Sequence, residues 1–84
     1  TNIILIIMDT VQHNSISGPF STEFTTNGSS FTSLYSNAPW TLPSHASLFT
    51  GTTPSKHGAH AGHKHLDNTL TTLPEILHTH DYET

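Results

Sequence analysis

The chain has 84 residues, 32% of them hydrophobic, and no cysteine, which excludes disulfide bonds and a thiolate zinc site as supports for a small core. Its formal net charge is −4 with only two basic side chains, Lys56 and Lys64, so it lacks the basic face that nucleic-acid binding requires. Because a chain of this length buries only about 60% of its unfolded surface, and because it begins without Met inside an apolar run, we expect residues 1–84 to be a truncated part of a longer catalytic domain.

The sequence opens with a continuous apolar run, Ile3 to Met8, which ends at Asp9. The run is far shorter than the roughly 20 residues that a helix needs to cross a bilayer, so no membrane segment is predicted within the chain. Its length and β-branched content are typical of a strand buried on both faces, as in a parallel sheet covered by helices. A buried helix is the competing interpretation, but the length favours a strand.

The middle of the chain predicts a loop, a short strand and a helix. Residues 12–30 are rich in Ser, Thr, Asn and Gly and predict irregular structure, and residues 31–35 predict a second short strand. Thr41 is a good N-cap, Pro43 is tolerated in a first turn, and Gly51 suits a C-terminal stop. A helix from about Leu42 to Thr50 follows from this pattern.

The last third predicts a loop, a second helix and a strand. Residues 52–68 combine one proline, two glycines and four histidines and are typical of an active-site loop. Thr72 and Glu75 form a capping-box pattern, and Leu73, Ile76 and Leu77 give the apolar stripe of a helix. Residues 82–84 resemble the start of another strand. The order strand, helix, helix, strand predicts an α/β sandwich.

Asp9 is a candidate metal ligand because it ends the most buried strand candidate. In open α/β sheets, ligands bind beyond the carboxyl ends of the strands. A carboxylate there suits a hard cation such as Mg²⁺ or Ca²⁺ and can also bind Zn²⁺ or Mn²⁺. The alternative is that Asp9 only caps a turn or helix.

Thr41 is a candidate nucleophile because it stands at a predicted helix N-terminus. The backbone N–H groups and the helix dipole favour an anion at that position, such as a phosphate or sulfate ester. A hydroxyl coordinated to a metal there can be deprotonated and attack phosphorus or sulfur. The alternative is a plain N-cap threonine.

The histidines of the run "KHGAHAGHKH" suggest a second kind of function. Spacings of three and two residues between imidazoles can support zinc or nickel, so a non-catalytic, histidine-rich metal-binding module is an alternative to an enzyme. Two intervening glycines weaken any helical face, and no carboxylate lies inside the cluster, which favours a polar loop instead. The histidines in question are His57, His60, His63 and His65.

Three stretches together resemble the sulfatase family of the alkaline phosphatase superfamily. They are "NIILIIMDT", "SNAPWTLPSHASLFTGTTPSKHG" and "LTTLPEILHTHDYET". In that family an apolar strand delivers a metal-binding Asp, and a motif of the form C/S-x-P-S-R-x4-TG supplies the nucleophile at a helix start. The resemblance implies the N-terminal portion of an alkaline-phosphatase-like α/β sandwich, with a mainly parallel central sheet flanked by helices.

The resemblance also implies roles for individual residues. Asp9 matches the first metal-ligand Asp, and Thr41 matches the nucleophile, which also binds the metal. His45 stands at the motif Arg and is implied as a catalytic group, although an imidazole is a poorer clamp for an anion than a guanidinium. The family reaction is attack of the nucleophile on a sulfate or phosphate ester through a covalent ester, with a divalent cation that the sequence does not identify among Ca²⁺, Mg²⁺, Mn²⁺ and Zn²⁺.

The nucleophile position departs from true sulfatases. Those enzymes oxidise a Cys or Ser to formylglycine, and Thr41 cannot give that aldehyde, whereas relatives with an unmodified Thr act on phosphoesters. The substrate implied is therefore a small-molecule sulfate or phosphate ester, with the phosphoester favoured. The family's second pair of metal ligands comes from much later in the chain, so we expect residues 1–84 alone to be inactive.

Overall fold

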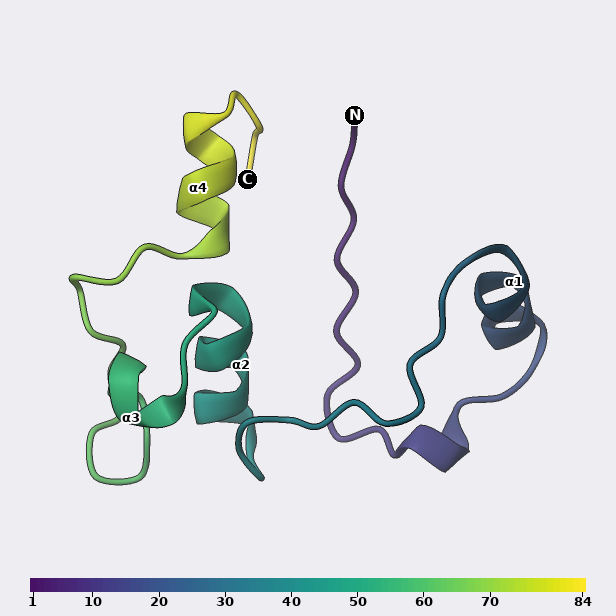
Figure 1. The fold of residues 1–84 in the computed structure, drawn as a ribbon, viewed down its shortest axis with the longest axis horizontal. Coiled ribbons are helices and arrows are strands. Elements are labelled where there is room, and N and C mark those ends of the chain that lie inside the picture. Colours follow the sequence, from purple (N-terminus) through teal and green to yellow (C-terminus); the bar gives the residue numbers. More distant parts are fainter. The chain divides into compact units, whose positions relative to one another are not determined.

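The computed structural model describes residues 1–84, the side chain of Phe20 excepted, as five short helical elements joined by coil (Figure 1). No helix among these residues is both long and apolar enough to cross a membrane. The chain divides into two compact units, Thr1–Leu34 and Tyr35–Thr84. In chain order the elements are η1 (His13–Ser15), α1 (Pro19–Asn27), α2 (Thr41–Thr50), α3 (Pro54–His57) and α4 (Leu73–Thr79).

The predicted strand at Ile3 to Met8 is not formed in the structure. The segment is extended coil (Figure 1), and its apolar side chains are exposed, with Ile4 83% accessible. The short strands predicted at residues 31–35 and 82–84 are also coil, and the described residues contain only an isolated antiparallel bridge between His60 and His63. A strand exists only where a neighbour pairs with its backbone N–H and C=O groups, and none does so here. The central sheet of the predicted sandwich is therefore not confirmed.

The prediction of a loop over residues 12–30 was wrong, because this segment contains η1 and α1. Gly18, with φ 103°, turns the chain into α1, and Pro19 occupies its first turn, where a fixed φ and a missing N–H are tolerated. The hydroxyl of Thr25 donates to the Ser21 carbonyl at 3.0 Å, and the Asn27 amide donates to the Glu23 carboxylate at 3.0 Å. Polar side chains that suggested a loop are thus accommodated by bonds within the helix.

The predicted helix at Leu42–Thr50 is confirmed as α2, which begins one residue earlier. Trp40 is the N-cap residue, and its carbonyl accepts from the Ser44 N–H at 3.3 Å. Gly51 ends the helix in the left-handed conformation at φ 66°, and its N–H donates to the Ser47 carbonyl at 2.9 Å. Thr41 is therefore the first helical residue and not the N-cap that the sequence predicted.

A short helix, α3, lies inside the predicted loop of residues 52–68. Pro54 begins it, and Gly58, with φ 77°, ends it. Both α3 and α4 pack against α2. The buried residues of this unit are few and mostly small or polar: Pro43, Ser47, His57 and Ala59.

The predicted helix after Thr72 is confirmed as α4, with its capping box formed. The Glu75 carboxylate reaches back and accepts from the Thr72 N–H at 3.3 Å and from the Thr72 hydroxyl at 2.8 Å. The chain leaves α4 at His80, and the Tyr82 N–H donates to the Leu77 carbonyl at 3.1 Å. Local bonds at both ends therefore define this helix.

Replacing the capping threonine should loosen α4 selectively. Thr72→Ala removes the hydroxyl that bonds to Glu75, and loss of such a cap costs about 1 kcal/mol. Amide hydrogen exchange in α4 should accelerate by about fivefold, while exchange in α2 is unchanged. Thr71→Ala, one residue before the cap, is the matched control. Equal exchange rates in the two variants would mean that the capping box does not stabilise α4.

Candidate functional site

Thr41 lies at the positive end of the α2 dipole with its side chain exposed. The first turn of α2 contains no acidic residue, so no carboxylate of that turn competes with an incoming anion. The backbone N–H groups of a helix N-terminus point along the axis toward such an anion. The structure therefore places the predicted nucleophile where a sulfate or phosphate oxygen is electrostatically favoured.

His45 follows Thr41 by four residues on α2, and residues at this spacing lie on one side of a helix. Both side chains line a cavity of about 620 Å³. Three of its lining residues are polar (Thr41, His45 and Thr72), and the others are apolar. Such a lining suits packed apolar side chains better than it suits the oxygens of a sulfate group. The apolar lining consists of Trp40, Leu42, Ala46, Phe49, Ala59, Leu66 and Pro74.

Asp9 lies in the N-terminal unit, in a turn directly after the extended apolar segment. The next residue, Thr10, has φ 58°, an unusual conformation for a β-branched residue, and its hydroxyl donates to the Asp9 carbonyl at 2.7 Å. The side chain of Asp9 is exposed. Because Thr41 belongs to the other unit, the convergence of the two side chains on one cation stays a prediction.

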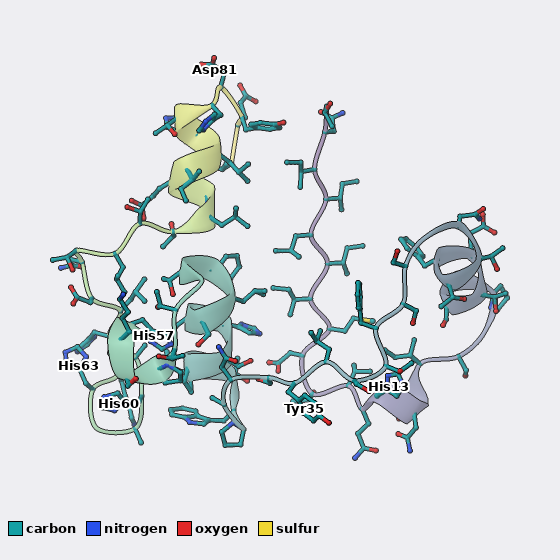
Figure 2. The ribbon with its side chains drawn as sticks, viewed as in Figure 1. His13, Tyr35, His57, His60, His63 and Asp81 are labelled. Atoms are coloured by element: carbon teal, nitrogen blue, oxygen red, sulfur yellow. The ribbon has the colours of Figure 1, made fainter. Side chains whose placement is uncertain are left out.

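Among the histidines that suggested a metal-binding module, His60 and His63 bond through their rings to the backbone of their own loop, the His57–Asp67 loop. The Asp67 N–H donates to the His57 carbonyl at 3.1 Å, and His60 and His63 exchange two backbone bonds of 3.0 Å. The His60 Nδ1 accepts from the Gly62 N–H at 3.1 Å. The His63 Nδ1 lies 3.1 Å and 3.0 Å from the carbonyls of Gly58 and His65, so it carries a hydrogen and donates. These bonds shape a loop (Figure 2).

His57 differs from the other histidines of the run because its side chain is fully buried. It lies between α3 and α2 (Figure 2), 3.0 Å from the Ser47 hydroxyl, and the sequence did not separate it from its exposed neighbours. No local signal marks this difference, because His57 follows the charged Lys56, and the exposed His60 lies between two alanines. The Ser47–His57 contact has no signal in the sequence.

The family model described as Sulfatase matches residues 1–84, the whole chain. The chain belongs to the sulfatase family. This assignment confirms the resemblance drawn from the three sequence stretches. Neither the comparison with curated proteins nor that with solved structures gave a match.

Sulfatases have an alkaline-phosphatase-like α/β fold, hydrolyse sulfate esters and generally use a divalent metal ion. For this sulfatase chain, the predicted donors are the Asp9 carboxylate and the Thr41 hydroxyl. Both are hard oxygen donors on exposed side chains, which fits a cation such as Mg²⁺, Ca²⁺ or Mn²⁺. Across residues 1–84 as described, no group of three or more His, Cys, Asp or Glu side chains is placed to hold an ion.

Asp67 has the perturbed carboxylate of this sulfatase chain. The N–H of Thr69 and then its hydroxyl, each donating to Oδ1 at 2.9 Å, hold the pKa of Asp67 below its ordinary value, and His63 acts in the same direction. A lowered pKa in the folded state stabilises the loop above the ordinary Asp pKa of ~3.9. That contribution is lost as the pH falls through the lower folded value.

We expect Thr69→Ala to raise the Asp67 pKa toward the ordinary value, because one of its two hydrogen bonds is removed. Carboxyl carbon chemical shifts, followed by NMR across the acid range, measure this pKa directly. Thr71→Ala, which leaves both bonds intact, is the control. An Asp67 titration identical in the two variants would show that the Thr69 hydroxyl does not hold the carboxylate.

Proposed function

We propose that this chain supplies the nucleophile and the first metal ligand of a metal-dependent hydrolase of sulfate or phosphate esters. The observation that carries the proposal is the position of Thr41 at the N-terminus of α2, within the ordered motif Thr41-x-Pro43-Ser44 that ends at Thr50-Gly51. Membership of the sulfatase family supports ester hydrolysis as the reaction.

In the proposed reaction, the Thr41 Oγ attacks the sulfur or phosphorus atom of the ester. The bond to the leaving alcohol breaks, the alcohol departs with a proton, and a covalent ester of Thr41 remains. Water then releases sulfate or phosphate and restores the hydroxyl. The N-terminal N–H groups of α2 stabilise the negative charge that develops on the non-bridging oxygens.

His45 is proposed to contact the transferred group, since it lies one helical turn from Thr41 on the same side of α2. Its imidazole can donate one hydrogen bond to an oxygen of the ester. A guanidinium at the same position would donate two in parallel. His45 therefore orients the anion less firmly than the family arginine would.

Asp9 and Thr41 are the residues proposed to hold a divalent cation. Such an ion supplies positive charge that lowers the pKa of a coordinated hydroxyl and neutralises developing anionic charge. Oxygen donors favour Mg²⁺, Ca²⁺ or Mn²⁺, although Zn²⁺ also accepts carboxylate ligands.

We further propose that phosphoesters are better substrates than sulfate esters for this protein. A threonine side chain cannot be oxidised to the formylglycine aldehyde of sulfatases proper, because its Cβ also carries a methyl group. The unmodified alkoxide of Thr41 is the nucleophile that remains, and it forms an ordinary phosphothreonine-type ester.

Replacing Asp9 or Thr41 in the full-length protein should abolish activity. Thr41→Ala removes the attacking atom, and we expect kcat to fall by about 10³-fold or more. Thr41→Ser restores a hydroxyl and should recover part of the rate. The measurement compares nitrophenyl sulfate, phosphate and phosphodiester substrates side by side.

Thr71→Ala and Asp81→Asn are the matched controls, and both should retain the parent rate. Full activity in Thr41→Ala would exclude Thr41 as the nucleophile. A strong preference for the sulfate ester would contradict the phosphoester proposal but leave the roles of Asp9 and Thr41 standing.

We also infer that purified residues 1–84 show little or no turnover. Two proposed protein ligands are half of the set that the family resemblance implies, so the cation should bind weakly. Assay of residues 1–84 with excess divalent metal tests the inference, and robust turnover would contradict it.

A further inference from the structure

The buried centre of the C-terminal unit is a hydrogen-bond relay that runs through His57. The imidazole has no accessible surface, and both of its nitrogens have partners. The Ala59 N–H donates to Nδ1 at 3.0 Å, and Nε2 lies 3.0 Å from the Ser47 hydroxyl. Ser47 and Ala59 are themselves buried, so water does not compete for these bonds.

The chemistry of the donors fixes the direction of every bond in the relay. A backbone N–H can only donate, so the His57 Nδ1 accepts and carries no hydrogen. In a neutral ring the hydrogen is then on Nε2, and it is donated to the Ser47 oxygen. His57 is therefore a single tautomer whose two nitrogens cannot exchange roles without leaving a buried group unpaired.

The relay holds α2 on the side opposite to the reactive residues. Pro43 and Ser47, four residues apart, form the buried side of the helix, whereas Thr41 and His45 form a second pair at the same spacing. At about 100° per residue, Pro43 is rotated about 200° from Thr41 around the axis. The hydrogen bond between Ser47 and His57 on the buried side therefore determines the rotation of α2 about its axis. That rotation sets the direction in which Thr41 and His45 point.

Ser47 also takes part in the last turn of α2. Its carbonyl accepts from the Gly51 N–H at 2.9 Å, and Gly51 leads through Pro54 into α3, which ends at His57. The side chain of His57 thus closes a loop that starts and ends on the same turn of α2. Rotation or sliding of α2 relative to α3 would break the bond between Ser47 and His57.

We propose that His57 is a positioning residue, which acts through Ser47 to fix the rotation of α2 and hence the attack geometry of Thr41. This role rests on the proposed function of Thr41 as the nucleophile. His57 itself contacts no substrate, so its effect is on kcat and not on substrate binding.

Two amide substitutions separate the two bonds of the imidazole. In His57→Gln the side-chain NH₂ takes the place of Nε2–H and keeps the bond to Ser47. In His57→Asn the side-chain oxygen takes the place of Nδ1 and keeps the bond from the Ala59 N–H, but the link to Ser47 is lost. Ser47→Ala removes the same link from the other side.

Steady-state kinetics of the full-length protein test the proposal. We expect His57→Asn and Ser47→Ala each to lower kcat by about 10- to 100-fold with KM changed by less than about threefold. His57→Gln should retain most of the rate. The double variant should be no slower than either single one, because both remove one interaction.

A merely structural role predicts a different pattern, and it would overturn the proposal. In that case both amide variants lower the melting temperature, but kcat per folded molecule stays within about twofold of the parent. Losses that multiply in the double variant would also overturn it, since the two residues would then act separately.

The tautomer provides a test that needs no activity. Nitrogen-15 NMR of the His57 ring should report hydrogen on Nε2 alone, and a ring with hydrogen on Nδ1 overturns the relay. If Thr41→Ala keeps full activity, the proposed function fails, and His57 has no nucleophile at Thr41 to position. If Thr41→Ala is inactive while His57→Asn is fully active, the positioning proposal alone is wrong.

Discussion

The buried pair of Ser47 and His57 is the interaction on which the rest of the C-terminal unit depends. An imidazole without solvent access must satisfy both nitrogens internally, and here the two partners come from α2 and from the segment after α3. The same residue accepts at its carbonyl from the Asp67 N–H. One buried side chain and its backbone therefore join α2, α3 and the His57–Asp67 loop, with very little apolar burial to help.

The chemistry proposed for this chain uses the opposite side of the same helix. The N-terminus of α2 is exposed at Thr41, and its first turn has no acidic side chain, so the helix dipole is available to an anion. The ten residues of α2 therefore combine two features: a buried hydrogen bond from Ser47 to His57 on one side, and an exposed N-terminus at Thr41. The proposed nucleophilic hydroxyl thus stands on a helix, which holds a side chain more precisely than a loop does.

The sequence predicted α2 and α4 correctly because their limits are set by local interactions. Gly51 ends α2 in a conformation that favours glycine, and Thr72 with Glu75 caps α4 through bonds between near neighbours. The helix α1 was missed, because its Ser and Thr residues suit loops in general and are accommodated here only by bonds to the preceding turn. The strand at Ile3 to Met8 was not confirmed, since a strand's bonds come from other segments.

The residues of the candidate site show the same difference between what local sequence decides and what packing decides. The sequence by itself determined the family and the order of Asp9, Thr41 and His45, because motif spacing is a property of the sequence alone, and it predicted the start of α2 to within one residue. Only the tertiary structure distinguished His57 from the other histidines of its run and paired it with Ser47. Burial and hydrogen bonding between residues ten apart depend on how helices pack, and no local pattern encodes that packing.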